Sequence, residues 1–361
     1  MILKRLDWYI IKKFLSTFFI SLLLIIGIVI IFDISEKIDD FVRTEAPLKE
    51  IAFKYYLNFI PYFMNMYSSM FVFLTVIFFT SQMAQRSEII AILCTGTSFH
   101  RLMVPYLISA VLIAALSLGL GLWVIPKANG VRVDFEQKYI KRAKAKAGHD
   151  VHYKLEDNKF VYVESFSSWN NTAYNFTLEH LSEDHLVSKL SAESAQWDSL
   201  KGTWTLKNWI IREYGEGLDD HITSGKQRDT TLSLTVDDFY RNEHTIERLN
   251  EAELNALIHT QIERGDANVR DAQIERNTRF SMPISVIILT IIGVSLSTKK
   301  RRGGIGWNIA LGIALGFSYI LFMQFSKMFV ITDTLPAYIA IWMPNVLFAI
   351  IAAFLYRIAP K

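Results

Sequence analysis

Cysteine is almost absent from this chain of 361 residues, in which Cys94 is the single example. One cysteine excludes an intrachain disulfide and any metal site built from several thiolates. A domain of this chain that is exported from the cytoplasm must therefore fold on its hydrophobic core, without covalent cross-links.

Sequence motifs of common catalytic sites are also missing. The pair Gly225-Lys226 lacks a glycine at the required distance upstream, so the chain has no phosphate-binding loop for ATP. The Gly-x-Ser-x-Gly motif of hydrolases is absent as well. His149 and His152 are three residues apart, but no carboxylate pattern accompanies them, which favours ordinary polar histidines over metal ligands. We therefore expect a chain that is not an enzyme and needs no metal or other cofactor.

Charged residues are missing from six long stretches, although they make up 20% of the chain. Hydrophobic residues make up 51% of the sequence and are concentrated in these stretches, as in membrane proteins. The first stretch follows a basic start and lacks a signal-peptide cleavage pattern, so we interpret it as a retained anchor; as a helix it reaches about 28 Å, close to the hydrocarbon thickness of a bilayer. The sequence predicts six membrane spans, at residues 14–32, 55–85, 102–125, 280–298, 305–326 and 335–356.

The spans contain almost no ionisable groups at mid-depth. An ion-coupled carrier needs buried charge to bind its ion, because a charge inside a membrane is costly and is kept only for function. The sequence therefore argues against a secondary transporter. Energy must come from another chain, or none is needed.

Lysine and arginine lie beside the spans and indicate the orientation of the chain. This placement explains the net charge of +3 through the positive-inside rule and gives little support to nucleic-acid binding. With the N-terminus in the cytoplasm, every inner segment has a basic excess, including the run at 299–302. The sequence thus predicts two cytoplasmic termini, a cytoplasmic segment at 85–96, and a large outward domain at 126–276.

The predicted division is into residues 1–125 with three spans, the outward domain at 126–276, and residues 277–361 with three further spans. From Val151 onward, short runs alternate with turn signals, which is typical of an all-β domain. Two forms of this domain remain open: a closed antiparallel sandwich, or an open β-fold whose apolar interior accepts a lipid chain. We expect strands at 151–155, 159–164, 175–180, 186–197, 204–214 and 230–235, with helices flanking the β-region.

The segment at 85–96 has the pattern of a single amphipathic helix. Ile89, Ile92 and Leu93 fall on one side, Gly96 is placed to end the helix, and Ser98 is placed to begin the next one. Such a helix offers a surface to a cytoplasmic partner. Arg86 and Glu88 are either a solvated surface pair or a contact in which Glu88 inserts into a cleft of that partner.

Several of these residues resemble the LptF/LptG permease family, and the details are closer to LptG than to LptF. The resemblance lies in Leu6-Asp7-Trp8-Tyr9-Ile10 before the first span, Ala84-Gln85-Arg86-Ser87-Glu88 with Gly96 after the second, and Phe160-Val161-Tyr162-Val163-Glu164 in the outward domain. It implies a subunit of the ABC transporter that extracts lipopolysaccharide from the bacterial inner membrane. The implied partners are a paralogous LptF/LptG-type permease, an LptB-like ATPase dimer, and LptC/LptA-like proteins that receive lipid from a periplasmic β-jellyroll.

The resemblance also implies roles for particular residues. Glu88 would be the acid of the coupling helix, seated in a groove of the ATPase, with Arg86, Ile89 and Leu93 as flanking contacts. The first and fifth spans would form a lateral gate. For the lipid phosphates, charge pairing suggests Lys37 and Lys327, although Lys37 lies among Glu36, Asp39 and Asp40, and Lys327 is equally explained by snorkelling to the headgroups.

A different class of function is also compatible with the sequence. The chain could be a membrane-anchored periplasmic assembly or scaffold protein that transports nothing. The two hypotheses differ in one observable property, because only the permease requires a stable complex with an ATPase.

Overall fold

The computed structural model describes the chain at residues 4–140, 146–147, 149–155, 158–167, 169–182, 185–199, 201–215, 220–241, 246–266, 268–298 and 304–359. The basic run at 299–302 and Lys361 lie outside these ranges. The chain forms two compact units. The helical unit comprises Met1–Ile140, Glu247–Glu251 and Gln273–Lys361, and the β-unit comprises Lys141–Ile246 and Ala252–Ala272.

Within the described residues, six helical segments are long and apolar enough to cross a membrane, as predicted. Each extends beyond its predicted span, because the charged residues that bound the apolar run mark the membrane surface and do not end the helix. The first is α1 (Arg5–Arg43), and the second runs from α2 (Leu48–Glu50) through the π-helical η1 (Ile51–Tyr56) into α3 (Leu57–Gln85). The third combines α5 (Phe99–Gly119), η2 (Leu120–Val124) and α6 (Ile125–Tyr139), and the others are α9 (Val269–Ser297), α10 (Gly304–Ile331), and α11 (Ala337–Ala340) with α12 (Met343–Ile358).

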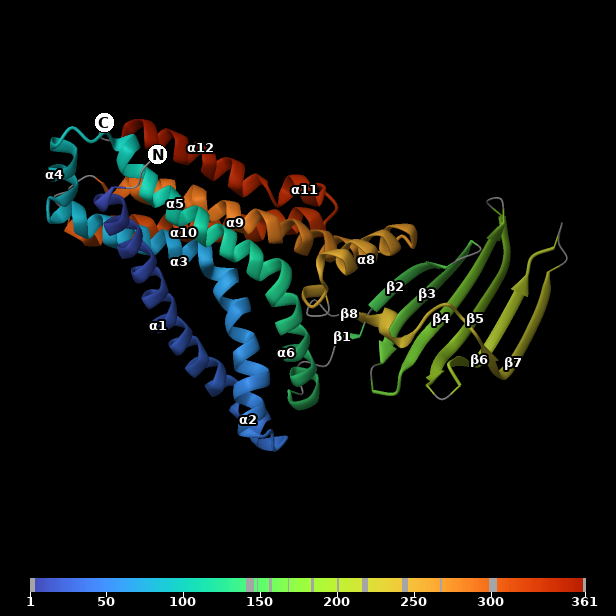
Figure 1. Ribbon diagram of the computed structural model, residues 1–361. Helices are drawn as coiled ribbons and strands as arrows, with labels where there is room; N and C mark the ends of the chain where they lie inside the picture. Colours follow the sequence, from blue (N-terminus) through green and yellow to red (C-terminus); the bar gives the residue numbers. More distant parts are fainter. Residues whose placement is uncertain are drawn as a thin grey trace. The chain divides into compact units, whose positions relative to one another are not determined.

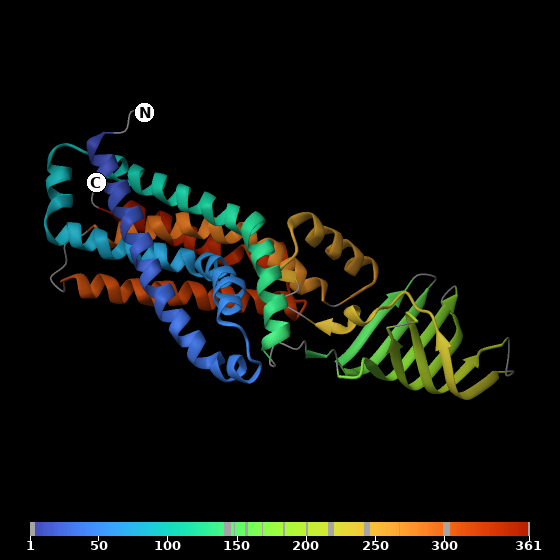
Figure 2. The same cartoon turned by 60° about the horizontal axis from the view of Figure 1, so that its bottom comes forward.

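The third span bends where α5 passes through η2 into α6 (Figure 1). Gly119 directly precedes this π-helical turn and Gly121 lies within it, and Pro126 at the start of α6 cannot donate the backbone hydrogen bond that a straight helix would need. A short helix, α4 (Glu88–Cys94), connects α3 to α5. The two chain termini lie at the end of the helical unit that carries α4 (Figures 1 and 2), as expected for an even number of spans.

The core of the helical unit at this end is largely aromatic. Phe79 of α3 and Tyr106 of α5 stack with their ring centroids 5.3 Å apart, and Phe14 of α1 packs against both rings. Around them lie buried side chains of α1, α3, α4 and α5, including Ile10, Met83, Ile89 and Leu102. These four helices therefore share one hydrophobic core near the termini.

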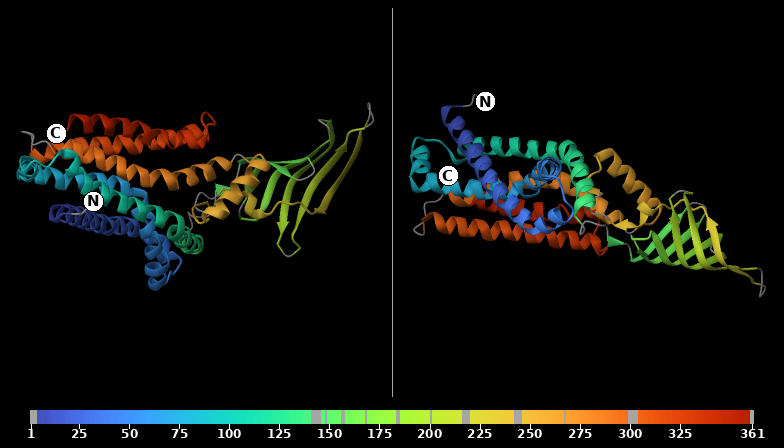
Figure 3. Two further views of the ribbon diagram at one scale, coloured as in Figure 1. Left: turned by 45° about the horizontal axis from the view of Figure 1, so that its top comes forward. Right: turned by 90° about the horizontal axis from the view of Figure 1, so that it is seen from below.

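The β-unit contains a six-stranded antiparallel sheet in which the strand order follows the chain. The strands are β2 (His149–Leu155), β3 (Lys159–Ser167), β4 (Thr172–Ser182), β5 (His185–Asp198), β6 (Thr203–Glu213) and β7 (His221–Thr230). A second, two-stranded sheet pairs β1 (Lys146–Ala147) with β8 (Tyr240–Arg241). The larger sheet is strongly twisted and curved, as Figure 3 shows. The predicted all-β domain inserted between the third and fourth spans is confirmed.

One face of the sheet is apolar. Its register places Val163, Phe176, Ala192 and Trp209 side by side across β3 to β6. The segment after β7 covers part of this face, from β2 and β3 across to β6: Leu234 and Phe239 are buried on it, and the indole of Trp204 in β6 donates a hydrogen bond to the Leu234 carbonyl oxygen at 2.9 Å. Farther along, partly buried side chains continue the apolar surface, at Leu178, Leu190 and Trp209. Of the two forms considered from the sequence, the described strands fit the open fold, since they supply no second layer opposite this end of the sheet.

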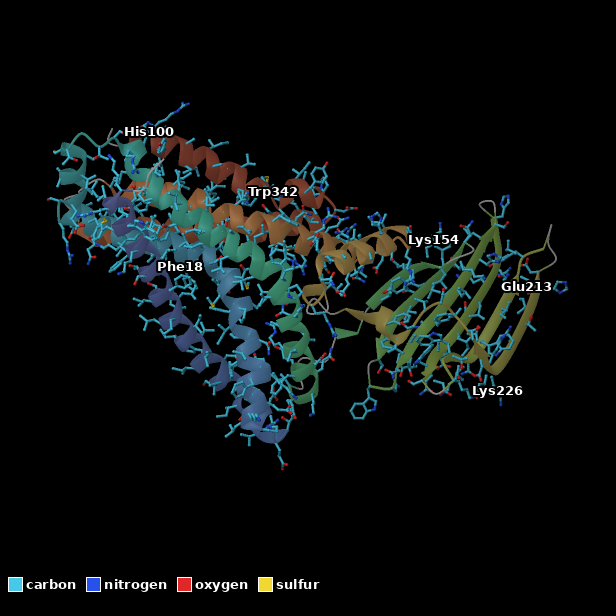
Figure 4. The ribbon with its side chains drawn as sticks, viewed as in Figure 1. Phe18, His100, Lys154, Glu213, Lys226 and Trp342 are labelled. Carbon is cyan, nitrogen blue, oxygen red and sulfur yellow. The ribbon has the colours of Figure 1, made fainter. Side chains whose placement is uncertain are left out.

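The predicted strand at 230–235 is wrong. The last strand of the six-stranded sheet is β7, from His221 to Thr230, and residues 231–235 after it belong to the covering segment and form no strand. Strand β7 was not recognised in the sequence because His221–Thr230 reads HITSGKQRDT, a polar run without alternating apolar residues. An edge strand with both faces exposed needs no such alternation, since its ladder of hydrogen bonds to β6 alone holds it in place. Figure 4 shows Lys226 on this edge strand.

Candidate functional site

The short helix α4 is the first candidate site, and local backbone geometry defines its limits. After α3 ends at Gln85, Arg86 makes a turn and Ser87 adopts a left-handed conformation with φ of 58°. α4 ends at Cys94, and Gly96, with φ of 81°, supplies the positive φ that the next turn requires. The side chain of Ser98 then caps α5 by accepting a hydrogen bond from the Arg101 amide. The predicted helix, its glycine stop and its serine restart are present, with α4 shorter than the 85–96 segment.

The apolar side of α4 faces the core of its own unit. Ile89 is fully buried there, and Ile92 and Leu93 pack against the same core. A helix of seven residues is not stable alone, and burial of its apolar side is what holds it in place. In this structure Ile89 therefore supports α4 from inside its own unit, and its contact with a partner stays a prediction. The exposed surface of α4 consists of Arg86 next to it and of Ile90, Ala91 and Cys94.

Glu88 begins α4 and lies beside the N-terminal part of α1. The hydroxyl of Tyr9 donates a hydrogen bond to Glu88 Oε2 at 3.1 Å, and Lys13 Nζ lies 4.0 Å from the same oxygen. Lys13 also donates to the Tyr9 hydroxyl at 3.1 Å. The carboxylate side chain keeps 29% of its surface exposed, so a cation from outside the chain has room to approach it.

An ion pair with a buried carboxylate connects the same part of α1 to α5. Asp7 is 2% exposed, and Arg101 donates from two guanidinium nitrogens to its two carboxylate oxygens, at 2.7 and 2.5 Å. The backbone amide of Lys4 gives Asp7 a third hydrogen bond at 2.7 Å. A paired geometry of this kind is strong and directional. At the same end His100 hydrogen-bonds to Tyr356, which ties the start of α5 to the end of α12; Figure 4 labels His100 there.

Lys37 and Lys327, the two predicted lipid contacts, both lie beside acidic side chains of their own unit. Lys37 Nζ is 2.6 Å from Asp33 Oδ1 and hydrogen-bonds to Tyr55, whose ring it also covers. Lys327 is half-buried on α10 and interacts electrostatically with Glu275. Their positive charge is thus partly neutralised, and the two lysines are not brought together with the α4 site.

A second group of ionic side chains was missed from the sequence. Arg132 of α6 is 3% exposed; it donates to Glu247 Oε2 at 3.3 Å, lies 3.6 Å from Glu136 Oε1, and stacks over the ring of Tyr62. Arg279 of α9 is 7% exposed and donates to Glu275 Oε1 at 2.9 Å. The Tyr62 hydroxyl also donates to Glu247, at 2.9 Å. Glu247 is 115 residues from Arg132 in sequence, so no local spacing indicates the pair.

The side chains of the described residues contain no group of three histidine, cysteine, aspartate or glutamate residues arranged to hold a metal ion. The geometry at α4 suits attachment to a partner. The apolar side of this short helix packs on a shared core, its first residue is held by Tyr9, and its other side is exposed.

Comparisons with known proteins give a consistent result. A family model described as "Lipopolysaccharide export system permease LptF/LptG" matches residues 8–358. Two curated proteins named "Lipopolysaccharide export system permease protein LptG", from Escherichia coli strain K12 and from Escherichia coli O6:H1, are each 20% identical to this chain over 284 residues, which is 76% of either chain.

Proposed function

Because the chain belongs to the LptF/LptG family of lipopolysaccharide export permeases, we propose that it is the permease subunit of an ABC transporter that extracts lipopolysaccharide from the inner membrane. A separate, LptB-like ATPase dimer supplies the energy, and the lipid passes to a periplasmic bridge of LptC/LptA-like proteins. The chain is a multi-pass membrane protein; in this proposal its termini and α4 are cytoplasmic, and the β-unit is periplasmic. The division into residues 1–125, 126–276 and 277–361 follows from that orientation.

The observation that carries the proposal is the construction of α4. Helix α4 has a buried side that fixes it to α1, α3 and α5, and an exposed side next to Arg86. In the proposed complex Glu88 pairs with a basic residue in the ATPase groove, and Arg86 contacts the rim of that groove. Ile89 and Leu93 act from behind, by holding the helix in position.

Two surfaces support the proposed lipid path. Large apolar side chains are exposed along α1 and α10, among them Leu23, Leu24, Phe32, Phe317 and Phe325. A monomeric soluble protein rarely exposes so much apolar surface, and here lipid and a paralogous permease would cover it. In this proposal the lateral gate is formed by the first span, α1, and by the fifth span, which is α10 in this chain, across the contact between the two permeases.

The open end of the β-sheet suits the exit of the lipid. Leu178, Leu190 and Trp209 give it an apolar surface on which acyl chains can lie after they leave the membrane. Lys37 contributes to lipid binding only after exchange of its partner Asp33 for a lipid phosphate, whereas Lys327 interacts with Glu275 only electrostatically.

The experiment that tests the proposal compares Glu88→Ala with the wild type in the assembled complex. ATP hydrolysis and its stimulation by lipopolysaccharide are measured in nanodiscs, together with co-purification of the ATPase. We expect Glu88→Ala to lower the stimulated rate at least 10-fold or to release the ATPase, since a desolvated charge pair is lost. Glu36→Ala is the matched control, because it removes an exposed glutamate from the opposite end of α1.

Two outcomes contradict the proposal in different ways. If Glu88→Ala and Glu36→Ala both behave like wild type, Glu88 is a solvated surface charge without a coupling role. If the wild-type chain never co-purifies with an ATPase, the scaffold function replaces the permease.

A further inference from the structure

Helix α4 packs against α1, α3 and α5, and of these only α1 is not directly linked to it along the chain. Arg86 and Ser87 alone separate α4 from α3, and four residues, 95–98, separate it from α5. Any movement of α4 therefore reaches α3 and α5 through the chain itself. α1 has no such link, so only contacts between side chains decide whether it follows.

The contacts of α1 at this end are of the kind that transmit movement. Asp7 and Arg101 form a pair with two parallel hydrogen bonds, and the Lys4 amide fixes the carboxylate from the other side. The Asp7 side chain is 3% exposed and that of Arg101 is 25% exposed, so separation of the pair would leave the buried carboxylate without its cation and is therefore opposed. The start of α1 is in this way fixed to the first turn of α5.

A second contact joins α1 directly to α4. Tyr9 and Lys13 lie one helical turn apart on α1, and both approach Glu88 Oε2. Ile10 and Phe14, which directly follow Tyr9 and Lys13 in α1, are fully buried in the same core as Ile89 of α4. Polar and apolar contacts thus lie on the same stretch of α1, from Asp7 to Phe14.

Phe18 and Leu22 continue the contact of α1 with this core, and α1 becomes more exposed only after Leu22. Leu23, Leu24, Ile28, Ile31 and Phe32 expose half or more of their surface. The next polar contact is at Asp33, which accepts hydrogen bonds from Tyr55 and Tyr56. A displacement of the start of α1 would therefore change the position of its exposed middle part.

We propose that Asp7 and Tyr9 are positioning residues that make α1 move together with α4 as one body, so that a partner acting on α4 moves the gate helix directly. The inference rests on the proposed function and adds to it the residues through which movement leaves α4. Tyr9 acts through Glu88, and Asp7 acts through Arg101.

The first experiment measures whether α1 and α4 move together. Spin labels are placed at Trp8→Cys on α1 and at Thr95→Cys directly after α4, in a Cys94→Ser background; both labelled positions are exposed. In the assembled wild-type complex we expect the same label-to-label distance with and without a non-hydrolysable ATP analogue. Addition of Tyr9→Phe and Asp7→Asn should broaden the distance distribution. A nucleotide-dependent shift in the wild type, or an unchanged distribution in the variant, overturns the proposal.

The second experiment measures lipid released per ATP hydrolysed in proteoliposomes. Tyr9→Phe keeps the aromatic ring and removes only the hydroxyl that reaches Glu88, and we expect the ratio to fall roughly 5-fold, a typical size for coupling between sites. Lys13→Gln is a parallel variant that removes the charge near Glu88. Lys12→Gln is its control, because Lys12 is exposed beside it and carries the same charge.

The outcomes separate this inference from the function on which it rests. A Tyr9→Phe complex that assembles and releases as much lipid per ATP as wild type overturns the role of Tyr9 and leaves the permease function intact. A wild-type complex that releases no lipid on ATP hydrolysis contradicts the proposed function itself. If the variant that contains Asp7→Asn does not fold, because a buried charge is lost, the distance measurement is made on Tyr9→Phe alone, which leaves the pair of Asp7 and Arg101 intact.

Discussion

Close packing around single residues decides several features of the β-unit. Gly225 of β7 pairs with Trp209 of β6, and the indole ring lies across the position that a side chain at 225 would occupy. A Cβ atom there would come within 2.8 Å of Trp209 Cζ2 and 2.9 Å of Cε2. The ring is rigid and also stacks with Arg228, so it cannot move aside without loss of that contact. Glycine is therefore needed at 225 for space, although it has an ordinary strand conformation.

We expect Gly225→Ala to destabilise the β-unit by about 1–3 kcal/mol, as for an overpacked site. The measurement is the rate at which a soluble protease cleaves the β-unit of the detergent-solubilised chain over a range of urea concentrations. Gly130→Ala in α6 is the matched control, because no atom lies within 4 Å of the position its Cβ would take. Equal cleavage of both variants would show that Trp209 adjusts at no cost.

At the scale of single elements, α4 shows how much of a site a sequence pattern can predict. Its existence, the glycine stop at Gly96 and the cap at Ser98 follow from local chemistry and are confirmed. The pattern could not tell whether Ile89 faces a partner or its own unit, because both are apolar surroundings. The contacts of Glu88 were invisible for a different reason: Tyr9 is 79 residues away in sequence.

The same limit applies to the other elements. Membrane spans can be predicted from the sequence because the bilayer requires about 20 apolar residues in a row, whatever the tertiary structure. The edge strand β7 was missed because it buries neither face. The network around Arg132 was missed because the whole β-sheet separates Glu247 from Arg132 in the sequence. Short-range patterns thus predicted the architecture, and long-range pairs required the structure.

Burial of Ile89 is expected to hold α4 against the rest of its unit. Ile89→Ala removes a fully buried side chain and should cost about 2–4 kcal/mol, which is enough to detach a helix of seven residues. The measurement is hydrogen exchange of the α4 amides in the detergent-solubilised chain. Ile90→Ala is the control on the neighbouring residue, whose side chain is 46% exposed. Identical exchange in the two variants would mean that the core contact does not determine the stability of α4.

At the scale of the whole molecule, function depends on which side of the membrane each unit faces. Positive-inside bias, two termini at the α4 end and an even number of spans all favour a cytoplasmic α4. In the proposed orientation an ATPase reaches α4 from the cytoplasm, and a lipid bridge reaches the β-unit from the periplasm. The orientation is therefore a condition that both proposals must satisfy.

Two cysteine positions test this orientation in intact cells. Cys94 is exposed on α4, and Trp169, in the turn after β3, is 92% exposed on the β-unit. We expect a membrane-impermeant thiol reagent added to spheroplasts to label Trp169→Cys in a Cys94→Ser background, and to label Cys94 of the wild type only after the membrane is opened. A charged reagent cannot cross the hydrocarbon layer, so the labelling pattern reports the side directly. If Cys94 reacts in closed spheroplasts and Trp169→Cys does not, α4 faces the periplasm. No ATPase could then act on it, and both the coupling role of Glu88 and the joint movement of α1 and α4 would be excluded.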